Sequence, residues 1–247
     1  MIETRFEKDV YHIVLNRPEK HNAIDAAMIA RLSEAVHEVP AEARAVLFTG
    51  NGKSFCAGAD VAYMRAQAEA GEDVNREEAR KLAHMFEAIY LLPMPTIAHV
   101  HGNVFGGGLG IVAACDMALA TENARLCFSE VNLGIIPAVI SPYVLRKTGV
   151  AFAKRYFLSG EVFTAEVARN ASLVCEVFSE ANASAQLEKL LKAVTGAGHG
   201  AQKSVKKLLH AFENFEPLSR DQLIFELAKL RATEDAQTRM KKFLERK

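Results

Sequence analysis

Several features are missing from the sequence, and each absence excludes a class of protein. The four cysteines, at 56, 115, 127 and 175, form no Cys-x-x-Cys pair, and the N-terminal residues lack the apolar core of a signal peptide. No apolar run reaches the ~20 residues that a membrane helix needs. Lys plus Arg equals Asp plus Glu at 30 each, and no basic run is interleaved with aromatic residues. The sequence therefore predicts a cytoplasmic protein with reduced thiols that binds neither nucleic acid nor a membrane.

What the sequence does contain is enough apolar content for a large core. The 247 residues are 50% hydrophobic, which suits one large domain or one domain with an appendage. Strand-like runs occur only before residue 180, and helical runs follow from Ala183 onward. We predict a mixed α/β core over residues 1–182 and a helical region over residues 183–247 that buries apolar faces against other subunits.

Local patterns predict the individual elements. Strand-like runs on either side of Glu7-Lys8-Asp9 predict a hairpin, and Asp25 is a candidate N-cap for a helix from Ala26 to about Val39. Apolar runs predict further strands at 45–49, 96–100, 115–120, 125–129 and 173–178. Helical spacing predicts helices near residues 82–90, 151–158, 164–169, 186–194, 202–212 and 219–231.

The stretch from Val100 to Gly110, Val-His-Gly-Asn-Val-Phe-Gly-Gly-Gly-Leu-Gly, runs from a predicted strand through a glycine-rich loop into an apolar segment. Three successive glycines at 106–108 let the backbone approach a ligand closely. The apolar segment from Leu109 predicts a short buried helix, whose first N–H groups would point back into the loop. Such a helix start attracts an anion or a carbonyl oxygen, without specifying which ligand carries it.

A dinucleotide-binding motif is a second interpretation of this stretch. The run from Gly108 through Gly110 to Ala113 fits the fingerprint G-x-G-x-x-A, and Glu130 lies 20 residues beyond Gly110, where the ribose-binding acid is expected. The fingerprint glycine should follow its strand directly, however, whereas residues 102–107 intervene here.

A P-loop and a metal site are also weighed. Gly52-Lys53-Ser54 resembles the end of a P-loop, but the first glycine of that motif would fall at Leu47, which excludes it. His99 and His101 share one face of a strand, yet no third ligand lies at a metal-binding spacing. We therefore expect both histidines to be packing or loop residues and expect no metal.

Four motifs, in this order along the chain, resemble the enoyl-CoA hydratase/isomerase (crotonase) superfamily. They are Asn-Arg-Pro-x-x-x-Asn-Ala at 16–23, Phe-Cys-Ala-Gly-Ala-Asp at 55–60, His-Gly-x-x-x-Gly-Gly-Gly at 101–108, and Phe-Ser-Glu-Val-x-Leu-Gly-Ile-Ile-Pro at 128–137. The resemblance implies a spiral of ββα units with a C-terminal helical trimerisation region, assembled as a homotrimer or homohexamer. It also implies an acyl-CoA thioester as substrate and no cofactor, since coenzyme A enters as part of the substrate.

The same resemblance implies a set of site residues. Chemistry next to a thioester carbonyl places negative charge on its oxygen, so the site needs fixed hydrogen-bond donors there. By resemblance, the donors are the backbone N–H groups of Ala59 and Gly107, and Glu130 is the acid/base, with a pKa raised by its apolar neighbours. The residues implied to contact substrate or CoA are Ala23, Ala57, Gly58, Asp60, Val61, Gly106, Gly108, Pro137, Phe243 and Arg246. The alternative for Phe243 is ordinary helix packing, and for Arg246 it is a solvated terminus.

One position departs from the pattern of the well-known hydratases. Where those enzymes carry a second catalytic Glu, this sequence has Gly110. Members similar to bacterial methylglutaconyl-CoA hydratases also have Gly there, and Ile136 to Val144 resembles that subgroup. The resemblance therefore favours hydration of a branched or carboxylated 2-enoyl-CoA. The alternatives are a 3-enoyl to 2-enoyl-CoA isomerase using Glu130 alone, a nicotinamide-dependent oxidoreductase, and a catalytically silent acyl-CoA-binding protein.

Overall fold

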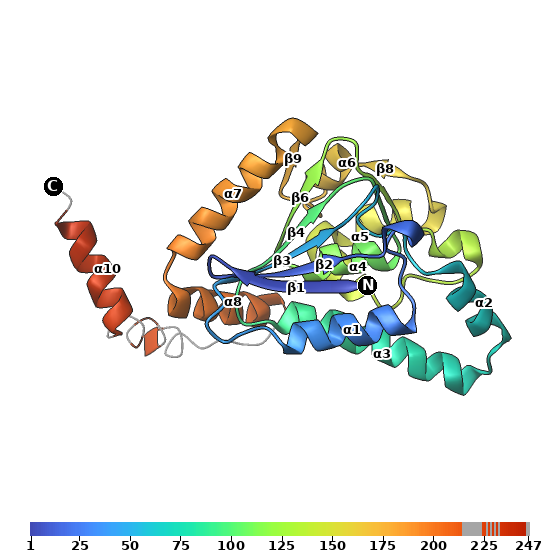
Figure 1. Ribbon diagram of the computed structural model, residues 1–247, viewed down its shortest axis with the longest axis horizontal. Helices are drawn as coiled ribbons and strands as arrows, with labels where there is room; N and C mark the ends of the chain where they lie inside the picture. The colour runs from blue at the N-terminus through green and yellow to red at the C-terminus, as the bar shows by residue number, and fades with distance from the viewer. Residues whose placement is uncertain (214–223, 226, 228, 230, 232, 246–247) are drawn as a thin grey trace.

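The computed structural model describes residues 1–213, 224, 225, 227, 229, 231 and 233–245, and it is a mixed α/β structure. A six-stranded sheet has the order β1-β2-β3-β4-β6-β9, and a second sheet has the order β5-β7-β8. Figure 1 shows α1 and α3 along one side of the main sheet and α7 across the other side. The chain therefore contains two layers of helices with the main sheet between them.

The strands are β1 (Ile2–Glu7), β2 (Val10–Leu15), β3 (Ala45–Gly50), β4 (Thr96–Val100), β5 (Asn103–Phe105), β6 (Met117–Thr121), β7 (Arg125–Cys127), β8 (Phe163–Thr164) and β9 (Glu176–Phe178). The α-helices are α1 (Ala26–His37), α2 (Val61–Glu69), α3 (Glu72–Leu91), α4 (Gly107–Ala114), α5 (Ser141–Ser159), α6 (Ala165–Asn170), α7 (Glu180–Gly196), α8 (His199–Glu213) and α10 (Glu234–Leu244). Two short 3-10 turns, η1 (Pro18–Lys20) and η2 (Glu130–Leu133), complete the described elements.

The first three elements form where the sequence predicts them. β1 pairs antiparallel with β2, and the tight turn between them places Lys8 and Asp9 at positive φ, as a two-residue hairpin turn requires. Asp25 caps α1, accepting a hydrogen bond from Met28 N–H at 2.8 Å. These local signals confirm the predicted hairpin and the predicted helix start.

The main sheet is buried on both faces. Strands β2, β3, β4, β6 and β9 run parallel in this sheet. Alternate residues of β3 enter different cores: Val46 and Phe48 contact the larger core, whereas Ala45 and Leu47 contact a smaller one. The smaller core is completed by apolar residues of α7, among them Val194. α7 therefore packs on the sheet of its own chain, and the predicted packing of residues 183–247 against other subunits stays a prediction.

The C-terminal part of the chain is described only in part. The predicted domain boundary after residue 182 falls inside α7, and Arg239 of α10 donates a hydrogen bond of 2.8 Å to the carbonyl oxygen of Gly196 at the end of α7. The predicted helix at 219–231 lies largely outside the described residues, and so does Arg246. Phe243 belongs to α10, but its side chain lies outside the described part of the chain. None of the described helices combines the length and apolarity needed to cross a membrane.

The glycine-rich stretch contains a strand that the sequence did not predict. Residues 103–105 form β5, which pairs parallel with β7, and Val104 also forms an isolated bridge with Cys56. Cys56 belongs to the second small-residue motif, and Cys127 at the end of β7 lies three residues before Glu130. The second sheet thus brings three of the four sequence motifs to one place.

Candidate active site

One cavity collects the central residues of the predicted site. Its volume is about 330 Å³, and its lining includes Ala57, Ala59, Gly106, Gly107, Glu130 and Pro137. Further lining residues come from α2, α3 and the segment that follows Glu130. Segments more than 70 residues apart in the sequence therefore contribute to one concave, largely apolar site.

Ala59 presents its backbone N–H to this cavity because of how its segment is paired. Ile24 and Ala59 form an isolated parallel bridge, in which Ile24 N–H donates to Gly58 O at 2.7 Å and Asp60 N–H donates to Ile24 O at 2.8 Å. This pairing uses the groups on either side of Ala59 and turns the Ala59 N–H the other way. Within the described residues, no hydrogen-bond acceptor takes that N–H, so it is free for a ligand.

Gly107 supplies a second free N–H from the first turn of α4. The sequence predicted that this helix starts near Leu109, but it begins at Gly107, two residues earlier. The N–H groups of Leu109 and Gly110 both donate to Gly106 O, whereas no hydrogen bond in the described part of the chain uses Gly107 N–H. The positive end of the α4 dipole therefore lies where Gly107 contacts the cavity.

Gly106, the first of the three glycines, lies next to both Gly58 and the Glu130 carboxyl group. Its φ of +46° is left-handed, and a Cβ atom added there would lie 3.4 Å from Glu130 Oε1 and 3.9 Å from Gly58 Cα. These separations are ordinary van der Waals contacts, so the positive φ rather than lack of space favours glycine here. They show that the Ala59 segment, the start of α4 and the Glu130 carboxyl group meet around one point.

Glu130 is a half-buried acid, and one of its oxygens has no partner among the described residues. Its Oε2 atom is buried and accepts no hydrogen bond from the described residues. Burial raises the pKa of Glu130 above its ordinary value, although its own backbone N–H partly opposes this shift. The structure confirms the direction predicted from the apolar neighbours. Glu130 does not end a strand as predicted, because β7 stops at Cys127 and Glu130 opens the turn η2.

Arg17 connects the first motif to the second. Its guanidinium contacts Asp25 Oδ2 at 2.7 Å and Asp60 Oδ2 at 3.2 Å. Burial alone would raise the pKa of Asp60, but hydrogen bonds from Ala62 and Tyr63 N–H, together with Arg17, hold it below its ordinary value. Since Asp60 directly follows Ala59, the two ion pairs fix the backbone that carries the Ala59 N–H.

Asn22, the Asn before Ala23 in the first motif, has a structural role. The side chain is fully buried, its Nδ2 donates to Asn51 O at 2.9 Å and Ser54 O at 2.8 Å, and its oxygen accepts from Arg17 N–H at 2.7 Å. The two bonds donated by Nδ2 join the turn after β2 to the segment before Ala59, and the bond from Arg17 N–H closes the turn itself. Asn22 therefore holds the two motif segments together from within the protein.

Replacing Arg17 by Met is expected to weaken both the fold and the site. The change leaves the buried Asp60 carboxylate without its cation, and we expect a loss of roughly 2 kcal/mol in the free energy of unfolding. For a chain of this size that corresponds to a melting temperature lower by roughly 4–8 °C. We further expect kcat to fall by roughly tenfold as Ala59 N–H loses its fixed position. Thermal unfolding and steady-state kinetics measure the two effects.

Arg31→Met is the matched control for this variant. Arg31 pairs with Glu34 and Glu38 on the exposed side of α1, where ion pairs contribute less than about 1 kcal/mol. Equal destabilisation by the two substitutions would contradict the positioning role of Arg17.

The other predicted contact residues occupy three kinds of position. Ala23 is buried beside the Ile24 bridge, and Gly58 takes a φ of +93° that allows the Ala59 segment to turn. Gly108 lies behind the cavity, where an added Cβ atom would lie 2.7 Å from Cys56 O. Val61 is exposed at the start of α2. Gly108 therefore contributes close packing of α4, whereas Val61 is accessible to a ligand.

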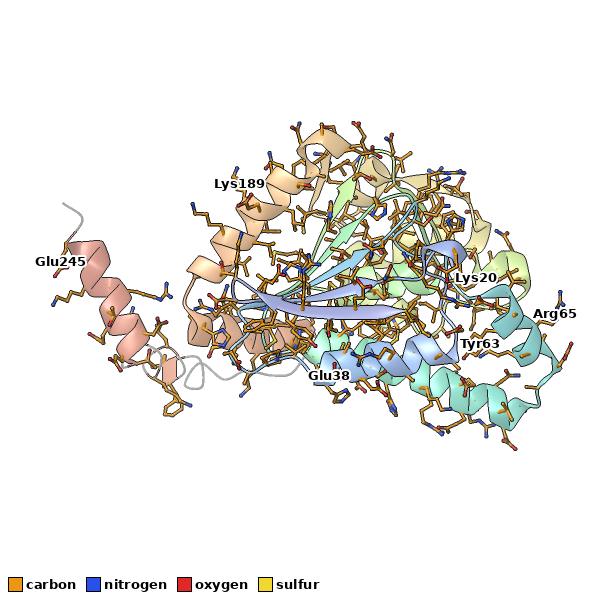
Figure 2. All side chains as sticks on the ribbon, in the orientation of Figure 1. Lys20, Glu38, Tyr63, Arg65, Lys189 and Glu245 are labelled. Carbon is orange, nitrogen blue, oxygen red and sulfur yellow. The ribbon has the colours of Figure 1, made fainter. Side chains whose placement is uncertain are left out.

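Tyr63 and Glu78 line the cavity and were not found from the sequence. Tyr63 Oη donates a hydrogen bond of 2.9 Å to Glu78 Oε2, which joins α2 to α3. Figure 2 labels Tyr63 on the side of α2 nearest α1 and α3, and Arg65 on the outer side of the same helix. A helical pattern at residues 61–69 would have found Tyr63, but α2 has no buried residue and so no apolar stripe.

The structure does not support the competing motif interpretations. Gly108 and Gly110 are buried inside α4 rather than in a loop between a strand and a helix, which removes the dinucleotide fingerprint. His99 carries a buried ring nitrogen without a partner, and burial, followed by the nearby His101, lowers its pKa. Among the described residues no group of three His, Cys, Asp or Glu side chains could hold a metal ion.

Comparisons with known proteins agree with this geometry. The family described as enoyl-CoA hydratase/isomerase matches residues 5–247. A Thermus thermophilus protein whose name places it among the enoyl-CoA hydratases is 33% identical over 201 residues, covering 81% of this chain and 79% of its own. The Mycosarcoma maydis enoyl-CoA isomerase/hydratase fer4 is 35% identical over 181 residues, covering 68% and 65%.

Solved structures show the same relationship in three dimensions. The crystal structure of an enoyl-CoA hydratase from Shewanella pealeana is 34% identical, with a TM-score of 0.91, and the match covers 100% of this chain and 94% of that chain. The fold is therefore the crotonase fold implied by the sequence motifs. Because the family matches the chain along nearly its whole length, the chain belongs to the enoyl-CoA hydratase/isomerase family.

Proposed function

We propose that this enzyme adds water across the double bond of a 2-enoyl-CoA thioester. The observation that carries the proposal is the buried, unpartnered Oε2 of Glu130 in the cavity that also exposes the free N–H groups of Ala59 and Gly107. A thioester oxygen held by the two N–H groups would bring the reacting carbons to the carboxyl group. An enolate oxygen is stabilised there by two fixed donors and by the start of α4.

The reaction needs only the groups of this site and the substrate. Water attacks the β carbon, its O–H bond breaks, and the proton passes to the Glu130 carboxylate. The electron pair of the carbon–carbon double bond forms the enolate double bond between the α carbon and the carbonyl carbon. The carbonyl π pair moves to the oxygen, where Ala59 and Gly107 would donate hydrogen bonds. Glu130 then returns the proton to the α carbon as the thioester carbonyl re-forms. One carboxyl group thus acts first as base and then as acid.

We further propose a branched acyl group, either uncharged or carboxylated as in 3-methylglutaconyl-CoA. Leu133, Ile135 and Ile136 line the cavity, and all three keep more than half of their surface exposed, so their apolar surface is available to a chain. Burying a methyl branch against them is favourable by about 0.8 kcal/mol per carbon. The resemblance to the methylglutaconyl-CoA hydratase subgroup is compatible with a branched uncharged chain and with a carboxylated one.

Isomerisation of a 3-enoyl-CoA is the second candidate, and Gly110 is the observation that favours it. A Cβ atom at this position would lie 2.5 Å from Phe86 Cζ and 2.5 Å from Ile140 Cγ2, so the space for a second carboxyl side chain is filled. Isomerisation requires a single base that removes a proton from one carbon and returns it to another. Glu130 alone is sufficient for that reaction.

Several family properties complete the proposal. Backbone near Ala23 and from Ala57 to Val61 would line the path of coenzyme A, with Phe243 and Arg246 contacting CoA bound to a neighbouring subunit. The enzyme would act without a cofactor, as a homotrimer or homohexamer in the cytoplasm. Sedimentation of the purified protein measures the assembly directly.

The test is turnover of defined thioesters. We expect hydration of crotonyl-CoA or of a 3-methyl-branched 2-enoyl-CoA to exceed isomerisation of a 3-enoyl-CoA. If isomerisation is faster than hydration, the protein is an isomerase rather than a hydratase. Binding of CoA without turnover of any thioester would indicate a catalytically silent protein, and binding of NADH without binding of crotonyl-CoA would indicate an oxidoreductase.

The pH profile is expected to report the raised pKa of Glu130. The carboxylate is the form that accepts the proton, so kcat/KM should rise as pH increases through the pKa of Glu130. Because burial raises that pKa, the midpoint should lie above the ordinary glutamate value of 4.5. Steady-state kinetics across the acidic range measure it. A midpoint at or below the value of an exposed glutamate would contradict the base role of Glu130.

A further inference from the structure

We propose that Glu78 makes the acyl pocket selective for uncharged acyl chains and excludes chains that end in a carboxylate. The inference rests on the proposed function and deepens it, because it separates two acyl classes that the sequence leaves together. It assigns a specificity role to a residue of α3 that belongs to none of the four sequence motifs.

Glu78 is held in the cavity wall as a fixed negative charge. Its side chain is 17% exposed, its Oε1 contacts Lys81 Nζ at 2.7 Å, and its Oε2 accepts the hydrogen bond from Tyr63 Oη at 2.9 Å. The hydrogen bond from Lys81 and then that from Tyr63 lower the pKa of Glu78. Burial and Glu78 raise the pKa of Tyr63, so its hydroxyl stays a neutral donor. The carboxylate therefore remains ionised and fixed at neutral pH.

Lys81 contacts Glu78 from outside the cavity, and the described cavity wall itself carries no positive charge. Glu78 and Glu130 both line the cavity, and among the described residues the lining contains no Lys, Arg or His. Lys81, the cation paired with Glu78, is 55% exposed and is not part of the lining. An acyl carboxylate would thus lose its water, gain no cationic partner and face the carboxyl groups of Glu78 and Glu130. Specificity against a ligand is often achieved by placing a like charge against it.

An uncharged chain meets a favourable wall in the same place. Leu82 of α3 lies one turn from Glu78 and lines the cavity, as do Leu133, Ile135 and Val139. These side chains can cover a methyl branch or an alkyl end, while Tyr63 and Glu78 satisfy each other. The cavity therefore favours binding of an apolar chain and disfavours binding of a chain that ends in a carboxylate.

The experiment compares two thioesters that differ in charge and hardly in shape. They are 3-methylglutaconyl-CoA and the amide of its terminal carboxyl group, assayed for hydration with wild type, Glu78→Gln and Glu77→Gln. Wild type is expected to prefer the amide by roughly tenfold or more in kcat/KM. Glu78→Gln keeps the shape of the side chain and removes its charge. We expect it to raise kcat/KM for the carboxylate by roughly fivefold or more and to change the amide little.

Glu77→Gln is the matched control, since Glu77 is exposed one residue earlier on α3 and pairs with Arg80. It should leave the ratio of the two substrates at the wild-type value. The inference is overturned if wild type prefers the carboxylate, if Glu78→Gln leaves the ratio unchanged, or if both variants shift it equally. Thermal unfolding shows whether each variant is folded. Hydration of neither substrate, nor of crotonyl-CoA, would instead contradict the proposed function itself.

Discussion

Glu130→Gln is expected to lower kcat for hydration by about 10³-fold, within the range that positioned acid/base groups contribute. The amide keeps the shape of the side chain but can neither accept the proton of water nor return it to the α carbon. Because Ala59 and Gly107 N–H remain in place, substrate binding should change much less, so KM should stay within a few fold. Single-turnover and steady-state assays on the same 2-enoyl-CoA separate the two effects.

The stability of this variant provides the control. A carboxyl group whose pKa is raised in the folded state costs stability as pH rises from the unfolded pKa through the folded pKa, and the cost is full above both. Glu130→Gln should therefore melt no lower than wild type at neutral pH, and its advantage should shrink in acid. A folded variant that retains wild-type kcat would show that another group moves the proton.

Gly110→Glu is expected to unfold the protein rather than complete a two-carboxylate site. Its Cβ atom alone would lie 2.5 Å from Phe86 Cζ and 2.5 Å from Ile140 Cγ2, in a helix whose residues from Gly108 onward are all buried. Overpacking and a buried charge together cost about 4 kcal/mol or more. For a chain of this size that lowers the melting temperature by roughly 8–16 °C, or leaves insoluble protein.

Gly71→Glu is the comparison for this substitution. A Cβ atom at Gly71 would have no neighbour within 4 Å, and the new acid would precede the first turn of α3, where negative charge is favourable. Thermal unfolding should therefore show little change. A soluble Gly110→Glu protein with the wild-type melting temperature and faster hydration would mean that the cavity extends to this position.

Local chemistry was enough to predict the elements near the N-terminus. Asp25 caps α1 through its own side chain, and the hairpin depends on two residues, Lys8 and Asp9, that adopt positive φ. Both signals act within four residues, so the sequence carries them in full. The raised pKa of Glu130 was predictable for the same reason, since apolar residues follow it directly in the chain.

Pairing between distant segments was not predictable from local patterns. β5 has three residues between glycines, too few for a recognisable period, and it exists because β7 and Cys56 pair with it. The meeting of Ala59 and Gly107 depends on the same pairings, so only the resemblance of whole motifs indicated it. Tyr63 and Glu78 meet across the turn between α2 and α3, and no pattern in residues 61–69 marked a helix.

The burial of β3 and β4 on both faces makes the main sheet far more rigid than α2, which lines the cavity. Separating these strands from their neighbours would disrupt both hydrophobic cores at once, so their amide protons can exchange with solvent only in nearly global unfolding. α2 has no buried residue, so its detachment costs mainly the contact of Tyr63 with the larger core and its hydrogen bond to Glu78. Opening of α2 is therefore expected to need far less free energy than opening of β3 or β4.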